Sequence, residues 1–161
     1  MIPPPHLRPF EPGDRAAIEA MAREVVEEGR QFAYEDVAGV LGYWIGPGIT
    51  TFVAVDGTQI VGTYALKPNQ PGRGAHVANA GYMVARAARG RGLGRLLGEH
   101  SLATARALGY SAMQFNFVVA TNTTAVALWE RLGFGVVGRL PRAFRLPEGG
   151  FADALVMHRE L

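Results

Sequence analysis

The sequence has no cysteine among its 161 residues. This absence excludes disulfide frameworks, thiolate metal sites and cysteine nucleophiles together. No apolar run approaches the roughly 18 residues that a membrane-spanning helix needs. The N-terminal MIPPPHLRPF also lacks the apolar segment of a signal peptide. We therefore expect a cytoplasmic protein with no membrane partner and no bound metal.

The sequence also has little excess charge. Its 16 Lys and Arg residues, among which Lys67 is the only lysine, face 14 Asp and Glu residues and give a net charge of +2. A nucleic-acid-binding protein would concentrate basic residues in a patch or stripe, so we expect no nucleic-acid partner. Hydrophobic residues at 48% and charged residues at 19% are typical of a folded globular protein. The length predicts that residues 1–161 form a single domain.

Glycine, in contrast, is abundant: 21 of the 161 residues are glycine, against an ordinary usage of about 7%. The glycines fall mostly between runs with strand or helix periodicity, as turn and capping residues do. Between them, the hydrophobic spacing predicts helices over residues 14–28, 34–45, 92–108 and 121–132. It predicts strands over residues 6–10, 51–55, 59–66, 76–84, 112–119, 134–137 and 154–158, with a loop rich in Pro, Arg and Gly between the last two. The order is β-α-α-β-β-β-α-β-α-β-β, which predicts an α/β (α+β) fold with a mixed sheet.

The densest glycine cluster follows a predicted strand and opens a predicted helix. Backbone N–H groups at a helix N-terminus have no intrahelical partner and favour an anion, and glycine lets the backbone approach phosphate oxygens. The cluster therefore indicates a phosphate or pyrophosphate site. The dinucleotide fingerprint fails because its third glycine position is Leu97, and the P-loop pattern fails because Lys67 is the only lysine. The cluster consists of Arg89, Gly90, Arg91, Gly92, Leu93, Gly94 and Arg95.

Two motifs together resemble the GNAT superfamily of acetyltransferases. The glycine-rich cluster resembles the family's acyl-CoA pyrophosphate loop, [R/Q]-x-x-G-x-[G/A]. About 30 residues later, the run from Asn122 to Phe134 resembles its second signature, N-x-x-A-x-x-L-[YW]-x-x-x-G-F. The element order matches the GNAT fold over nearly the whole chain. The resemblance implies that the strands at 76–84 and 112–119 are parallel and splay apart.

The resemblance also implies where acetyl-CoA, as co-substrate, would bind. Its pantetheine arm would enter the gap between the splayed strands and pair with backbone groups of Met83 and Val84, with Ala85 also in contact. Its pyrophosphate would lie on the Arg89–Arg95 loop. Asn122 would contact the arm or the nucleotide, cap its helix, or do both, and Trp129 would pack against the arm.

The chemistry that the resemblance implies is direct acetyl transfer to an amine. A backbone N–H near Val84 would stabilise the developing oxyanion. Many members use a tyrosine of the second signature to protonate the departing thiolate. Trp129 stands at this position, and an indole N–H is no practical acid. Tyr82, Tyr110 or water remain as alternatives, and His76 and Glu35 are open candidates for the general base.

Two asparagines within predicted strands are the best candidates for polar contacts with the reacting groups. Asn79 and Asn116 lie in the two strands expected to line the gap, and asparagine is depleted in strands. The runs HVANAGYMV, QFNFVV, TNTTAVALW and LPRAF also resemble a GNAT subgroup that acetylates proline analogues such as azetidine-2-carboxylate. That weaker resemblance suggests a small amino or imino acid as acceptor, with Arg139, Arg142 and Arg145 as candidate partners of its carboxylate.

The sequence leaves three functions open. The first is a small-molecule N-acetyltransferase, towards which the arginine-rich C-terminal loop leans. The second is a protein acetyltransferase that acts on an N-terminus or a lysine. The third is a catalytically silent acyl-CoA-binding sensor, which the replacement of the usual tyrosine by Trp129 keeps open. Since dimers are common in the resembled family, a homodimer is open as well.

Overall fold

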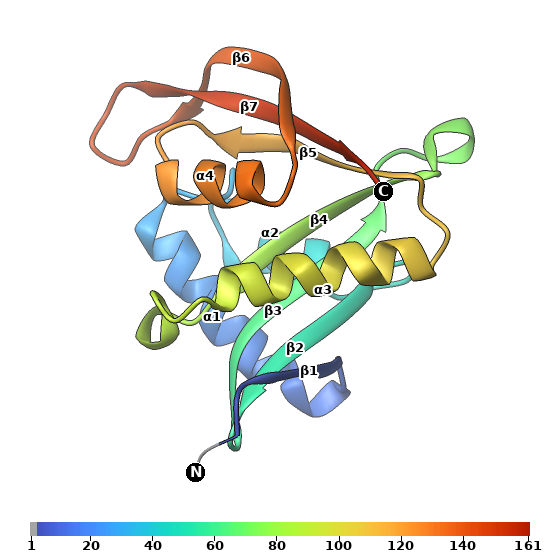
Figure 1. Cartoon of the computed structure of the whole chain (residues 1–161). Coiled ribbons are helices and arrows are strands. Elements are labelled where there is room, and N and C mark those ends of the chain that lie inside the picture. The colour runs from blue at the N-terminus through green and yellow to red at the C-terminus, as the bar shows by residue number, and fades with distance from the viewer. Residues whose placement is uncertain (1–2) are drawn as a thin grey trace.

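The computed structural model describes residues 3–161, which form a seven-stranded sheet flanked by four α-helices (Figure 1). The strand order in the sheet is β1-β2-β3-β4-β5-β7-β6, and only β4 and β5 pair in parallel. This confirms the predicted element order and the mixed sheet. The strands are β1 (His6–Pro9), β2 (Thr50–Asp56), β3 (Gln59–Pro68), β4 (Val77–Val84), β5 (Ala112–Val119), β6 (Gly135–Arg145) and β7 (Phe151–Glu160). The helices are α1 (Arg15–Glu28), α2 (Val37–Trp44), α3 (Leu93–Ala107) and α4 (Thr123–Arg131).

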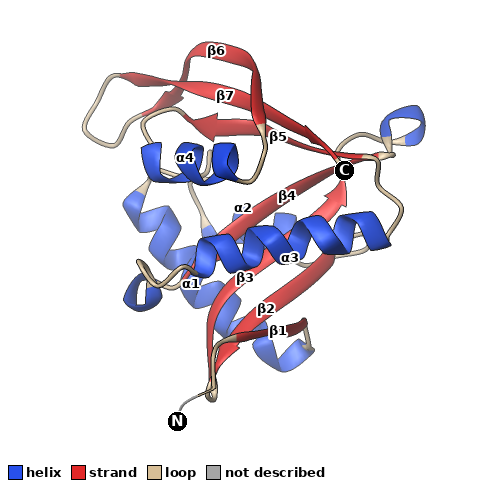
Figure 2. Ribbon diagram, in the orientation of Figure 1, coloured by secondary structure: helices blue, strands red, loops and turns tan. Residues whose placement is uncertain are grey.

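The helices cover the sheet on both faces (Figure 2). Helices α1 and α2 bury Ile18, Val25, Val40 and Trp44 against the strands on one face. Helices α3 and α4 cover the other face, where Leu97 is fully buried in a larger core. Each helix has an apolar stripe at helical spacing, and burying that stripe against the sheet is what stabilises it. Among residues 3–161, no helix is both long and apolar enough to cross a membrane.

The parallel pair β4–β5 opens soon after it begins. Val77 pairs with Ala112 and Ala78 with Met113, and no further residues of the two strands pair. Beyond this point β5 pairs only with β7, and β4 only with β3. The splayed pair that the resemblance implied is therefore present, and it leaves a gap at the C-terminal ends of both strands.

The predicted loop between the last two strands was wrong. Most of it is strand, because β6 and β7 form a long hairpin whose turn spans only residues 146–150. Proline suggested a loop, but β6 is an edge strand, and a bulge between Leu140 and Phe144 accommodates Pro141. Arg139, Arg142 and Arg145 consequently lie on a strand.

The start of the second helix was also predicted too early. The prediction began at residue 34, whereas α2 begins at Val37. Asp36 has an extended backbone, and its carboxylate accepts a hydrogen bond from the N–H of Gly39 (2.6 Å) as the N-cap. Tyr34 therefore belongs to the α1–α2 loop, residues 29–36, and not to the helix.

Candidate active site

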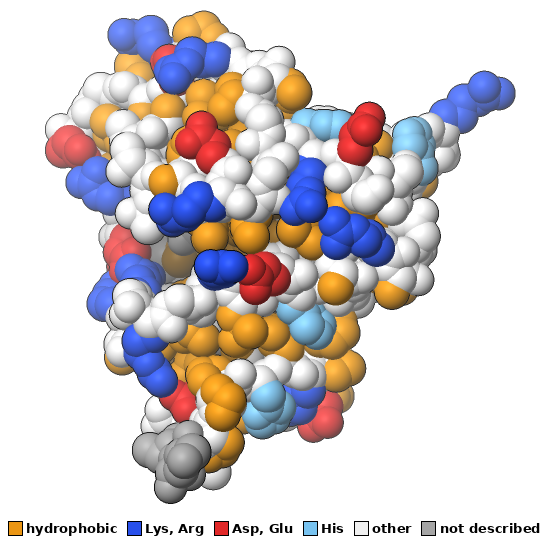
Figure 3. All heavy atoms as spheres, in the orientation of Figure 1, with side chains coloured by type: hydrophobic (Ala, Val, Ile, Leu, Met, Phe, Trp, Pro, Cys, Tyr) orange, Lys and Arg blue, Asp and Glu red, His pale blue; other side chains and the backbone are white. Residues whose placement is uncertain are grey.

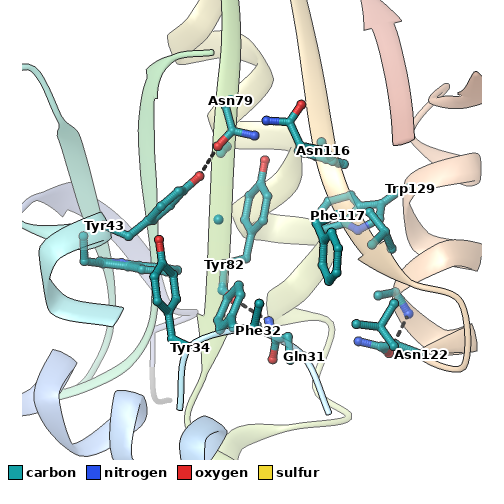
Figure 4. Close-up of a pocket in the computed structure, with 18 residues that line it drawn as sticks. Gln31, Phe32, Tyr34, Tyr43, Asn79, Tyr82, Asn116, Phe117, Asn122 and Trp129 are labelled. Carbon is teal, nitrogen blue, oxygen red and sulfur yellow. Dashed lines mark hydrogen bonds between the residues drawn. The ribbon is translucent and has the colours of Figure 1, made fainter. Parts of the chain in front are cut away.

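A pocket of about 270 Å³ lies in the gap between the splayed strands (Figure 4). The α1–α2 loop and α2 line one side of it, and β5 and α4 line the other, with β4 between them. The pocket thus gathers residues that are far apart in the sequence. Its lining consists of Gln31, Phe32, Ala33, Tyr34, Tyr43, Trp44, Asn79, Ala80, Gly81, Tyr82, Phe115, Asn116, Phe117, Val118, Val119, Asn122, Ala125 and Trp129.

A series of hydrogen bonds links polar side chains near the point where β4 and β5 part. The Tyr43 hydroxyl donates to Oδ1 of Asn79 (Figure 4). Nδ2 of Asn79 donates to the carbonyl of Gln114 on β5 (2.9 Å). The side chain of Gln114 in turn donates to Oδ1 of Asn116 (3.0 Å), and Asn116 donates to Asn69 (2.7 Å). The two asparagines singled out from the sequence therefore belong to one network at the point where the strands part.

Aromatic rings form the wall near α4. Trp129 is buried, with its ring centroid 4.6 Å from that of Tyr82 and 4.7 Å from that of Phe115. The Tyr82 hydroxyl bonds to Ser101 of α3 (2.7 Å), and burial raises the pKa of Tyr82 above its usual value. The arrangement fits Trp129 as a packing surface. The Tyr82 hydroxyl bonds to Ser101 and is not directed to a substrate in the pocket.

The other acid and base candidates lie outside the pocket. The carbonyl of His76 accepts a hydrogen bond from the N–H of Ser111 (3.0 Å), at the paired end of β4 and β5. Tyr110 directly precedes Ser111 and lies at that same end. Glu35 belongs to the α1–α2 loop, but it is exposed and does not line the pocket. The structure brings none of these three side chains to Asn79.

The glycine-rich cluster forms the turn that leads into α3. Gly90 and Gly92 have φ angles of +77° and +78°, which side-chain-bearing residues rarely adopt. Gly92 is the N-cap and makes no side-chain capping bond, so the first N–H groups of α3 keep their capacity to bind an anion. Open space surrounds the position of a Cβ atom at both glycines. The loop therefore presents an accessible, backbone-built anion site.

The three arginines of this cluster each hold a carboxylate. Arg89 pairs with Glu28 (2.8 Å), Arg91 with Asp56 (2.7 Å) and Arg95 with Glu99 (2.7 Å). Figure 3 shows the same intermixing of basic and acidic side chains over the α3 face. The attraction of an anion to the loop thus depends mainly on the helix N-terminus.

Backbone groups of β4 also face the gap. The N–H of Asn69 donates to the carbonyl of Val77 (2.8 Å), which fixes the alternation of hydrogen bonds along the β3–β4 pair. In an antiparallel pair, every second residue of a strand bonds to the same neighbouring strand. Met83 is six residues after Val77 and therefore directs its backbone groups to β3, as Val77 does. Tyr82 and Val84 alternate with it and direct theirs to the gap. Beyond Ala78, β5 offers these groups no partner.

Two side chains reach into this gap. Nε2 of Gln31 donates to the carbonyl of Tyr82 (2.7 Å), and Nε of Arg89 donates to the carbonyl of Val84 (3.3 Å). They satisfy two acceptors that a neighbouring strand would normally bond. At the far end of the gap, Asn122 lines the pocket and caps α4 by accepting from the N–H of Ala125 (3.3 Å).

The arginines predicted to bind a carboxylate do not line the pocket. Arg139 forms an ion pair with Asp153 (2.6 Å), and the backbone N–H of Arg142 bonds to the same carboxylate (2.9 Å). The guanidinium of Arg142 lies 4.6 Å from the ring centroid of Phe151, and Arg145 is exposed on the edge strand.

Sequence reasoning missed one side of the pocket. Tyr43 lies outside the apolar stripe from which α2 was predicted, so its position gave no sign that it faces β4. Gln31, Phe32 and Tyr34 precede α2, and Phe117 lies next to Asn116 in β5. Phe32, an aromatic residue between the two predicted helices, was the one available signal, since binding residues are often found on loops.

A splayed parallel pair followed by a glycine-rich helix start is the architecture of the acyl-CoA N-acyltransferases. Residues 14–134 match the family model described as the acetyltransferase (GNAT) family, and this chain belongs to that family. The broad resemblance drawn from the two motifs is confirmed.

Similar proteins agree with this assignment. A GCN5-related N-acetyltransferase from Kribbella flavida is 44% identical, with a TM-score of 0.92 and 98% of each chain covered. The N-acetyltransferase aca1 of Schizosaccharomyces pombe is 39% identical over 100 residues, which cover 62% of this chain and 48% of aca1. The chain thus spans less than half the length of the curated relatives that it matches.

The fold is also that of a GNAT superfamily phosphinothricin acetyltransferase from Sinorhizobium meliloti in complex with acetyl-CoA. The two are 22% identical with a TM-score of 0.86, and 98% of this chain and 88% of that chain are covered. The narrower resemblance to acetyltransferases of proline analogues stays a prediction.

Proposed function

We propose that this protein transfers an acetyl group from acetyl-CoA to the amine of a small molecule. The observation that carries this proposal is the pocket of about 270 Å³ in the splayed gap. This volume is just below the usual range of small-molecule sites, about 300–1,000 Å³, and the pantetheine arm would take up part of it. The α1–α2 loop lines one side of the pocket and narrows the access to it, which favours a compact acceptor over the side chain of a folded protein.

The backbone of the gap supports binding of acetyl-CoA as co-substrate. Tyr82 and Val84 offer backbone groups to a pantetheine arm, and the N-terminus of α3 suits a pyrophosphate. Ala85, the Arg89–Arg95 loop, Asn122 and Trp129 complete the contacts that we propose. Met83, which was expected to offer backbone groups to the arm, does not do so, because its backbone groups face β3 and its side chain packs in the core between α1 and the sheet.

For the reaction, we assign the polar contacts to Asn79 and Asn116. Oδ1 of Asn79 accepts one bond from Tyr43 and has a second lone pair for an N–H group of the acceptor. Asn116, at the other side of the gap, offers a further amide. The N–H of Val84 stands five residues further along β4 than Asn79, a span of about 16 Å, so in this arrangement it serves the pantetheine arm and not the acetyl oxygen.

The acceptor that we propose is an amino or imino acid or a derivative of one. The small pocket and its amide groups support this class. The arginines on β6 lend it no support, because they do not line the pocket.

A panel of amines tests the proposal directly. Release of CoA thiol is measured with amino acids, imino acids and their amides, and with a peptide of free N-terminus as the protein-like acceptor. We expect amine-dependent release with at least one small acceptor and little with the peptide. Tight CoA binding without any amine-dependent release would make the protein a sensor, and preference for the peptide would favour a protein acetyltransferase.

A further inference from the structure

The lining of the pocket carries no formal charge. Its 18 residues include no Asp, Glu, Lys, Arg or His. The polar side chains are amides and phenols, and the remainder are apolar. Enzymes that bind an amino acid normally meet its carboxylate with a cation and its ammonium with a carboxylate, because an unpaired charge is costly to bury. The side chains of the lining offer neither partner.

The only titratable side chains in the lining are three tyrosines. Burial raises the pKa of Tyr43 and of Tyr82 above the usual value of a phenol, so both stay protonated at neutral pH. The hydroxyl of Tyr82 is directed to Ser101, and that of Tyr43 donates to Asn79. Tyr34 lies at the mouth and is 44% exposed. None of the three is placed as a base beside Asn79.

The charged groups on the surrounding elements do not supply a base either. On β3, Nζ of Lys67 lies 3.8 Å from the centroid of the Tyr43 ring, outside the lining, and burial lowers the pKa of this group. Its positive charge engages the Tyr43 ring and would repel an ammonium. In the α1–α2 loop, Asp36 caps α2, Glu35 is exposed and Arg30 pairs with Glu148.

Beside β4, the carboxylate of Glu28 at the end of α1 is held by two arginines. Arg86 lies 3.0 Å from it and Arg89 2.8 Å. At the paired end of β4, His76 lies outside the pocket, and on α4 Glu130 is exposed. Across the gap, Asp153 of β7 is paired with Arg139.

We infer that the pocket selects an acceptor that is uncharged at both ends: a neutral amine carried by an amide or ester of an amino or imino acid, in preference to the zwitterion. This inference rests on the proposed function. The amide network fits such a molecule, because Oδ1 of Asn79 accepts from a neutral N–H and the amides match a carboxamide. An ammonium in the same place would lose its hydration without gaining a counter-charge.

The reaction needs no enzyme base when the amine binds in its neutral form, because every proton is then accounted for. The amine nitrogen forms a bond to the acetyl carbon while the carbon–sulfur bond breaks and its electron pair leaves on sulfur. The proton that nitrogen loses is taken up by the thiolate, directly or through water. A protonated acceptor must first release one proton to solvent, so the rate follows the neutral fraction of the acceptor.

This fraction differs greatly among amines near neutral pH. An α-amine with a pKa of 7.7–8.0 is about one-third neutral at pH 7.5, whereas an alkylamine with a pKa near 10.4 is about one-thousandth neutral. Weakly basic acceptors therefore have a large advantage that needs no specific contact.

The test measures kcat/KM from pH 6 to 10 with proline and prolinamide, and with alanine and alaninamide. We expect each amide to exceed its amino acid at least tenfold when kcat/KM is expressed per neutral amine, because the neutral fraction alone already favours the amide at pH 7.5. In each profile, kcat/KM should rise with pH, and the midpoint of this rise should equal the pKa of that acceptor's own amine. Between two acceptors the midpoint should therefore shift by the full difference between their amine pKa values. The variants Glu35→Gln and His76→Gln should leave the midpoint in place for every acceptor.

The opposite results separate the two proposals. Faster use of the zwitterions, or a midpoint at one fixed pH for all acceptors, would overturn the uncharged-acceptor inference while acetyl transfer itself stands. If Glu35→Gln or His76→Gln abolished the rise of kcat/KM with pH, that residue would be the general base. This result would also overturn the uncharged-acceptor inference. Absence of amine-dependent CoA release with every acceptor would instead overturn the proposed function.

Discussion

The two parts of the candidate site are built in different ways. The glycine-rich turn before α3 is one continuous segment, and its capacity to bind an anion comes from backbone N–H groups at a helix start. The pocket gathers side chains from β4, β5, α2, α4 and the α1–α2 loop. The first needs only a local conformation, whereas the second needs the whole fold to be correct. The turn therefore suits a cofactor common to a family, and the pocket suits an acceptor that varies among its members.

The two parts also differ in charge. The turn combines a helix N-terminus with three arginines, all of them paired with carboxylates. The pocket has no charged side chain in its lining. Substitutions in the turn should accordingly act on affinity for acetyl-CoA, and those in the pocket on use of the acceptor. The following predictions test that division.

The largest effect is expected for Gly92→Glu. It places a side chain at a φ of +78° and a negative charge where an anion would bind, so acetyl-CoA affinity should fall roughly 100-fold or more. Isothermal titration with CoA measures the change. The matched control is Gly109→Glu after α3, where φ is +88° and the space is equally open. It carries the same backbone strain, so equal loss of CoA affinity in both variants would refute the assignment of the loop.

Asn116→Ala should come next, with kcat/KM for the acceptor lowered about tenfold, which corresponds to one lost hydrogen bond of about 1.4 kcal/mol. Asn116 is exposed, so its removal should change the free energy of unfolding by less than about 0.5 kcal/mol. Steady-state kinetics and urea denaturation measure the two quantities. Asn69→Ala removes the outer partner of Asn116 and serves as control. Wild-type kinetics for Asn116→Ala would leave it a structural amide.

The contrast between the two parts explains which features of the site could be predicted from the sequence. The turn was predicted from residues 89–95 alone, because adjacent glycines and a helix start are visible in one short window. Asn79 and Asn116 could be found because an amide within an apolar strand is itself unusual. Both strategies depend on local composition.

Other features depend on packing that no local pattern contains. Tyr43 faces the pocket because α2 packs its aromatic side chains close against Gly81 of β4, and Gln31 because it bonds to the carbonyl of Tyr82. The β6–β7 hairpin was missed for a related reason. An edge strand has no need of an alternating apolar pattern, and the residues of β6 are nearly all exposed. Its proline and arginines therefore look like those of a loop.

Tyr43→Phe should have a smaller effect than Asn116→Ala on the acceptor. Loss of the hydroxyl leaves Oδ1 of Asn79 without its fixed donor, so the amide loses its orientation. We expect KM for the acceptor to rise about fivefold with KM for acetyl-CoA unchanged, and stability to fall by about 1 kcal/mol. Tyr34→Phe, at the exposed mouth, is the control for stability. A rise in KM for acetyl-CoA instead would place Tyr43 in the cofactor part of the site.

The smallest effect is expected for Trp129→Phe. Trp129 stands where many relatives are expected to have a tyrosine acid, but within residues 3–161 its indole N–H forms no hydrogen bond, and the ring packs on Tyr82 and Phe115. Phenylalanine keeps an aromatic surface there, so kcat should stay within about threefold of wild type, at some loss of thermal stability from the smaller ring. Trp129→Ala, which removes the surface altogether, should weaken CoA binding more. Complete loss of turnover in the phenylalanine variant, with CoA affinity and folding intact, would show that the indole N–H takes part in the reaction and that packing is not its whole role.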